Sequence, residues 1–168
     1  MNQIELVLPP SQARRAFLLL LGALAILAMA RTFQGLGFRP CELCFLERYA
    51  FYVGAPVAAL TAWLASRSAH GAAQALFVLL ALVFLANSGL AFYHVGVEQH
   101  WWAGPSTCTG ALIAPVNVND VANGVNVEPV VPCDVVPLRI IGLSLAGWDV
   151  VVSAAMAIYA GLAASLPK

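Results

Sequence analysis

Hydrophobic and polar positions are separated into long blocks along the chain. Four blocks consist almost entirely of apolar residues, and they cover residues 16–33, 49–65, 72–95 and 143–166. Each is close to the ~20 residues that a helix needs to cross a bilayer. Because the blocks are rich in Ala and Leu and show no period-2 alternation, they are typical of membrane-spanning helices and not of barrel strands.

The composition agrees with a protein embedded in lipid. Of the 168 residues, 61% are hydrophobic and 10% are charged, against about 45–50% and about 25% in globular proteins. This balance excludes intrinsic disorder, and a formal net charge of +0 gives no support for nucleic-acid binding. We expect a single domain over residues 1–168, an all-α integral membrane four-helix bundle with extracytoplasmic loops over residues 34–48 and 96–142.

The positive charges predict the orientation of this bundle. Residues 66–71 form a short turn, so both longer loops lie on one side of the membrane and both termini on the other. Arg14, Arg15, Arg67 and Lys168 lie with the termini, and Arg31, Arg39, Arg48 and Arg139 lie with the loops. The charges are denser on the side of the termini, because that side has far fewer residues. The positive-inside rule then places both termini in the cytoplasm.

The first apolar block also has features of a secretory signal peptide. Arg14 and Arg15 precede it, and Ala28-Met29-Ala30 has the small-residue pattern of a cleavage site. The block is long for a signal peptide, and three further apolar blocks follow it. We therefore interpret it as the first transmembrane helix, and cleavage would leave the rest of the topology unchanged.

The four cysteines all fall in the two loops, on one side of the membrane: Cys41, Cys44, Cys108 and Cys133. A disulfide between Cys108 and Cys133 could staple the long loop. The same role explains Cys41 and Cys44 poorly, because a bridge across two residues closes almost no loop and restrains the unfolded chain little. A C-x-x-C pair outside the cytoplasm more often carries redox chemistry or binds a metal.

The surroundings of the C-x-x-C pair favour a reactive thiolate. A proline precedes the pair, so we expect a helix to begin near Cys41, where free N–H groups and the helix dipole stabilise a thiolate. Arg48 shares a helical face with Cys44, and it could stabilise the thiolate or bind a carbonyl of a lipid-soluble ligand. The alternative for Arg48 is an interfacial arginine paired with Glu47 or Glu42.

Two dithiol pairs that face one compartment predict a relay of thiol–disulfide exchange. Cys108 and Cys133 lie in a loop long enough to reach a soluble partner. Cys41 and Cys44 lie at the membrane surface, within reach of an oxidant dissolved in the bilayer. A quinone fits that role, because it is apolar, accepts two electrons and diffuses in the membrane.

The motif around the first pair has a known counterpart. The segment PCELCFLER, from Pro40 to Arg48, resembles the C-x-L-C-x-x-E-R signature of the bacterial disulfide bond formation protein B (DsbB) family. Cys133-Asp134, followed by Gly142-Leu143-Ser144-Leu145 and Trp148, resembles the family's stretch into its last helix. Together with the four spans and the unequal loops, the resemblance runs from about Phe17 to Leu166.

The resemblance implies a membrane protein-disulfide oxidoreductase of the bacterial inner membrane that supports disulfide bond formation. Membrane quinone, either ubiquinone or menaquinone, would oxidise Cys41 and Cys44, with Cys44 beside the quinone ring and Arg48 binding it. The resulting disulfide would oxidise Cys108 and Cys133. These would reoxidise a soluble periplasmic thiol oxidase of the DsbA type through a mixed disulfide with Cys108.

The three histidines are weaker candidates. His94, at the loop end of the third span, is a candidate for lining the quinone site, and the alternative is a simple interfacial residue. His70 and His100 are expected on the surface.

Other classes of protein make different predictions. A membrane metal-binding protein would hold zinc or copper with four thiolates, but such sites usually come as two close pairs, so we predict no metal ligand. A structural adaptor with stapling disulfides would tolerate the loss of Cys44 or Arg48. A protein similar to vitamin K epoxide reductase would carry its ligand-side C-x-x-C in a late helix, whereas this pair opens the second span.

Overall fold

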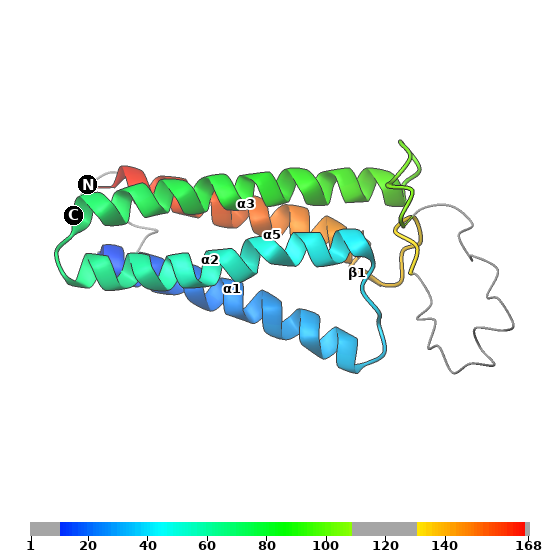
Figure 1. Ribbon diagram of the computed structural model, residues 1–168, viewed down its shortest axis with the longest axis horizontal. Coiled ribbons are helices and arrows are strands. Elements are labelled where there is room, and N and C mark those ends of the chain that lie inside the picture. The colour runs from blue at the N-terminus through cyan, green and yellow to red at the C-terminus, as the bar shows by residue number, and fades with distance from the viewer. Residues whose placement is uncertain (1–10, 109–130, 167–168) are drawn as a thin grey trace, which may run out of the picture.

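The computed structural model describes residues 11–108 and 131–166, so part of the predicted 96–142 loop lies outside the described residues. Within these ranges the chain forms long helices and a two-stranded hairpin (Figure 1). The elements are α1 (Gln12–Gly35), α2 (Glu42–Ser66), α3 (His70–Glu98), β1 (Arg139–Ile140), β2 (Leu143–Ser144) and α5 (Leu145–Ser165). Four described helices are long and apolar enough to cross a membrane. The protein is therefore an all-α, multi-pass membrane bundle, as the sequence predicts.

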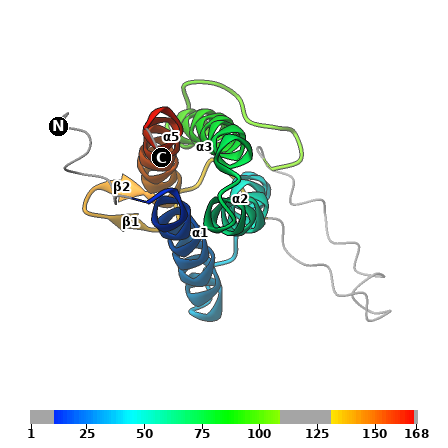
Figure 2. The same ribbon diagram turned by 90° about the vertical axis from the view of Figure 1, so that its left-hand side faces the viewer.

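The helices are arranged so that the four cysteines lie at one end of the bundle. α3 packs against α5 and α2, and α1 packs mainly against α2, so the four helices surround a common centre (Figure 2). The start of α1 and the end of α5 lie at one end of the bundle, and the two longer connections lie at the other (Figure 1). At this loop end α1 diverges from α3 and α5 (Figure 1).

The core is made of small residues and a few aromatic rings. Alanines line most of the helix contacts, and Phe51, Phe77 and Phe84 are fully buried among them. Small residues let helix backbones approach closely in lipid. Gly54 on α2 is one such place, because a Cβ there would lie 2.7 Å from Cζ of Phe84 on α3. Large apolar side chains point outward over the rest of the helices, as a lipid-facing surface requires.

The helix boundaries differ from the apolar blocks at the loop end. α2 begins at Glu42, directly after Cys41, which confirms the predicted helix start. α5 begins at Leu145 instead of residue 143, because Leu143 and Ser144 belong to a hairpin with β1.

The hairpin has a two-residue turn and extends sideways from the bundle (Figure 2). Ile141 and Gly142 have φ values of 52° and 85°, the left-handed conformation that such a turn needs at both central positions. The Trp148 indole N–H donates to the carbonyl oxygen of Ile140 at 2.9 Å. This bond ties the hairpin to the first turn of α5.

Candidate functional site

Cys41 and Cys44 lie together at the N-terminus of α2. Cys41 is the N-cap residue, and its sulfur accepts a hydrogen bond from the backbone N–H of Cys44 at 3.2 Å. The two sulfur atoms are 2.6 Å apart, and both residues are free cysteines. The hydrogen bond from the Cys44 side chain, helped by that from its N–H, lowers the pKa of Cys41 below its usual value, although burial opposes the shift. Cys41 is therefore the sulfur on which a thiolate is stabilised.

A histidine and a glutamate extend the site from Cys41 into the bundle. The His94 Nε2 atom on α3 lies 3.5 Å from the sulfur of Cys41. Its Nδ1 atom lies 2.7 Å from Oε1 of Glu47, and both side chains are buried. If Nδ1–H donates to the carboxylate, Nε2 is free to exchange a proton with the thiol. Glu47, a candidate partner for Arg48 by its position in the sequence, is paired with His94 instead.

Cys108 and Cys133 form a disulfide with a Cα–Cα distance of 5.3 Å. Both residues are buried, at 3% and 1% exposure, and the N–H of Cys133 also donates to the carbonyl oxygen of Cys108 at 2.6 Å. They share one buried cluster with Cys41, Leu43 and Val97. The fold thus brings the two pairs together, although two transmembrane helices separate them in the sequence.

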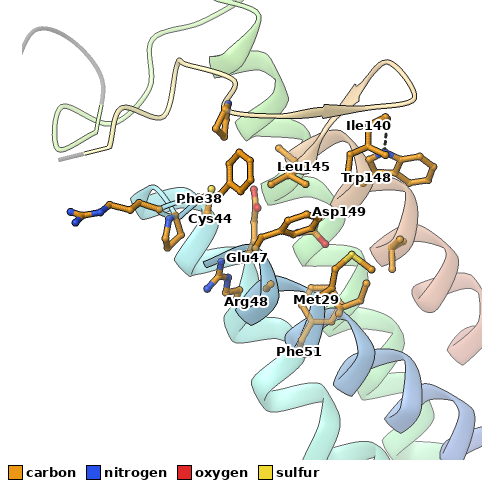
Figure 3. Close-up of a pocket in the computed structure, with 18 residues that line it drawn as sticks. Met29, Phe38, Cys44, Glu47, Arg48, Phe51, Ile140, Leu145, Trp148 and Asp149 are labelled. Carbon is orange, nitrogen blue, oxygen red and sulfur yellow. Dashed lines mark hydrogen bonds between the residues drawn. The ribbon is translucent and has the colours of Figure 1, made fainter. Parts of the chain in front are cut away.

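A cavity of about 330 Å³ opens on the other side of the first pair, where α1 diverges. Its walls come from α1, α2, α5 and the hairpin, and they are mostly apolar (Figure 3). Four lining residues carry reactive or charged groups within the helices: Cys44, Glu47, Arg48 and Asp149. A pocket of this size and character suits an apolar ring with a few polar substituents.

The residues predicted to bind quinone both line this cavity. Cys44 lies in the first turn of α2, and the Arg48 guanidinium carbon is 5.4 Å from the centre of the Phe45 ring. His94, a candidate for lining the quinone site, is not among the residues that line this cavity; it contacts Cys41 and Glu47 instead. His70 contacts Gln12 through Nδ1 at 2.9 Å and takes no part in the site.

A four-thiolate metal site is not formed by the described structure. Two of the four sulfur atoms are joined in the Cys108–Cys133 disulfide. The ligand atoms of Cys41, Cys44 and His94 do lie within 4.8 Å of one another. They offer two sulfur ligands and one imidazole nitrogen, whereas the metal-binding hypothesis requires four thiolates.

Sequence reasoning missed two functional candidates, Glu47 and Asp149. Asp149 is the only acidic residue in the last apolar block. An ionisable residue inside a membrane span usually marks a functional site, so the sequence contained a signal for Asp149. The Glu47–His94 pair had no comparable signal, since it joins residues 47 positions apart.

These features define a class of protein: a membrane-embedded dithiol protein, with two adjacent cysteine pairs and an apolar cavity beside one of them. Comparison with known proteins identifies the family. The family model described as "Disulfide bond formation protein DsbB" matches residues 12–163, and the chain belongs to this family. No solved structure matches the chain.

Two curated relatives carry the same description. Disulfide bond formation protein B 1 of Pseudomonas fluorescens is 32% identical over 148 residues, which cover 82% of this chain and 81% of the relative. Disulfide bond formation protein B of Herminiimonas arsenicoxydans is 36% identical over 86 residues, which cover 50% and 51%. As a member of the family, the protein is a membrane dithiol oxidoreductase that reoxidises a DsbA-type thiol oxidase.

Proposed function

We propose that electrons enter at the Cys108–Cys133 disulfide, pass to Cys41 and Cys44, and leave to a membrane quinone in the cavity. The observation that carries this route is the position of Cys41 and Cys44. Cys41 lies in the buried cluster that holds the second pair, and Cys44 lines the cavity. The C-x-x-C pair therefore lies between the donor and the acceptor.

The first exchange involves the soluble partner. A thiolate of a reduced DsbA-type protein attacks the Cys108–Cys133 disulfide and forms a mixed disulfide, and the partner's second thiol then releases it. One disulfide forms in the partner and one is reduced here. Cys108 and Cys133 are equally buried, so the choice of Cys108 for the mixed disulfide rests on the family resemblance.

The second exchange is internal. When Cys41 and Cys44 are joined, one of the reduced thiols of the second pair attacks Cys41, and Cys44 leaves as a thiolate beside the cavity. Closure of the Cys108–Cys133 disulfide then returns Cys41 as a thiol. The hydrogen bond from the N–H of Cys44 stabilises Cys41 as a thiolate, and His94 Nε2 can hold the proton that Cys41 loses.

The cavity residues fit a quinone. When bound, a quinone accepts two electrons and two protons and departs as the quinol. The apolar walls bury its ring, Cys44 presents its sulfur to the cavity, and the Arg48 guanidinium can donate hydrogen bonds to a carbonyl oxygen. Whether ubiquinone or menaquinone is used depends on the ring substituents that these walls admit.

The experiment that tests the route is anaerobic quinone reduction by the purified protein, supplied with a reduced DsbA-type partner. We expect stoichiometric loss of oxidised quinone, and we expect Cys44→Ser to abolish it. Cys108→Ser should still bind quinone but should not turn over with the partner. Normal turnover by Cys44→Ser would refute the route.

The role of Arg48 has a matched control. Arg48→His should raise the KM for quinone, whereas Arg67→His, at the opposite end of the bundle, should leave it unchanged. Arg67 is a suitable control because its guanidinium also lies over an aromatic ring, that of Trp63. An unchanged KM in Arg48→His would make Arg48 an interfacial arginine only.

The placement in the cell follows from the same arrangement. We propose the bacterial inner membrane, with both termini in the cytoplasm and both cysteine pairs at the periplasmic face. The denser positive charge near the termini supports this orientation, and the cysteine pairs lie together at the end opposite the start of α1 and the end of α5. Alkaline phosphatase fused to the C-terminus should be inactive, and an active fusion would reverse the orientation.

A further inference from the structure

Asp149 is an acidic residue inside a transmembrane helix that the thiol relay does not use. It lies in the second turn of α5 and lines the cavity together with Cys44 and Arg48. A carboxyl group in this position is costly in lipid and usually marks a functional site. Neither the cysteine motif nor the stretch that resembles the family's last helix includes it.

Among the described residues, the hydrogen-bond partners of the Asp149 carboxyl group are neutral donors. Nδ2 of Asn87, on α3, lies 3.3 Å from Oδ1 and 3.1 Å from Oδ2. The Ser153 hydroxyl lies 2.9 Å from Oδ1, and Asn87 and Ser153 are themselves buried. The other acidic residue in the helical wall of the cavity, Glu47, has an ionisable partner in His94. Asp149 is therefore the cavity carboxyl best placed to hold a proton.

A purely structural role would not require the carboxyl group. Asn87 already donates to the Ser153 hydroxyl at 2.9 Å, and the Ser88 hydroxyl donates to the carbonyl oxygen of Val150 at 3.1 Å. These bonds join α3 and α5 without Asp149. The Asp149 carboxyl group is thus not needed to join the two helices, and it lines the cavity.

We propose that the Asp149 carboxyl group is the hydrogen-bond and proton donor for one carbonyl oxygen of the quinone. This inference rests on the proposed function. A para-quinone carries its two carbonyl oxygens at opposite ends of the ring, so two walls of the site must supply donors. Arg48 lies on the α2 wall and Asp149 on the α5 wall (Figure 3).

The step balances in electrons and protons. The Cys41 and Cys44 thiols give up two electrons and two protons as their disulfide forms, and the quinone gains both as it becomes the quinol. Asp149 passes its proton to one quinone oxygen and then takes up one of the two protons released by the thiols, and the other released proton goes to the second quinone oxygen. Between these events, Asn87 and Ser153 stabilise the carboxylate by donating hydrogen bonds to it.

An infrared measurement tests the proton directly, without turnover. We expect short-chain ubiquinone, added to the purified protein in detergent, to shift the C=O stretching band of a protonated carboxyl. Asp149→Asn should remove the band, and its amide oxygen can still accept from Asn87 and Ser153. Glu42→Gln, at an exposed carboxyl near the same end of the bundle, should leave it unchanged. A band that persists in Asp149→Asn would overturn the proposal.

Kinetics separate proton donation from positioning. Asp149→Asn should lower kcat for quinone reduction by about 100-fold or more, with a smaller change in KM, and its rate should fall more steeply than wild type as the pH rises. Asp149→Glu should recover part of the rate. If wild type reduces quinone and Asp149→Asn matches it at every pH, this inference alone fails. If wild type does not reduce quinone at all, the proposed function fails first.

Discussion

The contact between Gly54 and Phe84 allows a prediction whose size follows from the structure. A Cβ added at Gly54 would meet Cζ of Phe84 at 2.7 Å and Cε1 at 3.2 Å. Phe84 is fully buried and packs against Phe51 with ring centres 5.7 Å apart, so the ring has little room to move. Phe51 also lines the cavity, and the disturbance should therefore reach the quinone site.

Two opposing terms decide the magnitude for Gly54→Ala. Replacing a helix-interior glycine by alanine favours the helix by about 1 kcal/mol. Overpacking a well-filled core typically costs about 1–3 kcal/mol. The net expectation is a loss of up to about 2 kcal/mol in the free energy of unfolding.

The matched control is Gly89→Ala on α3. Nothing lies within 4 Å of the Cβ that would be added at Gly89, so only the favourable helix term applies. The assay is unfolding of both variants and wild type in the same detergent, with the KM for quinone as a second measurement. We expect Gly54→Ala to be less stable than Gly89→Ala by about 1–3 kcal/mol and to have a raised KM. Equal stabilisation of the two variants would refute the packing argument.

Further predictions concern the thiols and their surroundings. The hydrogen bonds from Cys44 lower the pKa of Cys41, so the Cys41 thiolate is present at lower pH. Alkylation of Cys41 in the reduced protein, followed by mass spectrometry, should have a midpoint pH below the ~8.5 of a free cysteine. Cys44→Ala should raise that midpoint pH. His94→Gln should slow disulfide exchange at Cys41 by about 100-fold or more in stopped-flow measurements. Glu47→Gln should have a smaller effect, because the imidazole remains. Equal losses in the two variants would mean that His94 alone does not hold the proton that Cys41 loses. Quinone binding should quench Trp148 fluorescence, since this indole lines the cavity, and an unaltered emission would place the quinone elsewhere.

The sequence was most informative where the bilayer itself imposes the structure. Apolar blocks near the length of a membrane span must form helices in lipid, because an isolated span has to satisfy its own backbone hydrogen bonds. The blocks therefore predicted the four helices described. The start of α2 after Cys41 was also predictable, since a helix start depends on local residues. The start of α5 was not, because the hairpin that removes Leu143 and Ser144 depends on pairing with β1.

In the candidate site, too, some residues were predictable from the local sequence, and others depend on how the helices pack. The cysteines and Arg48 were identified from local spacing, and the number of spans between the pairs placed them on one side of the membrane. The partners of His94 were not predictable from the sequence, because Cys41 and Glu47 lie far from it in the chain, at the start of another helix. Asp149 was conspicuous as a charge in an apolar block, but its link to Asn87 depends on how α3 packs against α5.

The sequence by itself thus determined the class of protein, the transmembrane helices and the thiols, since these follow from hydropathy, span number and a local motif. Only the tertiary structure decided which groups meet: the Cys108–Cys133 disulfide beside Cys41, the pairing of His94 with Glu47, and the cavity that Asp149 faces. The physical reason is that small residues let the helices pack at many rotations in lipid. The rotation adopted, and with it the residues that face one another, is set by side-chain contacts over the whole bundle.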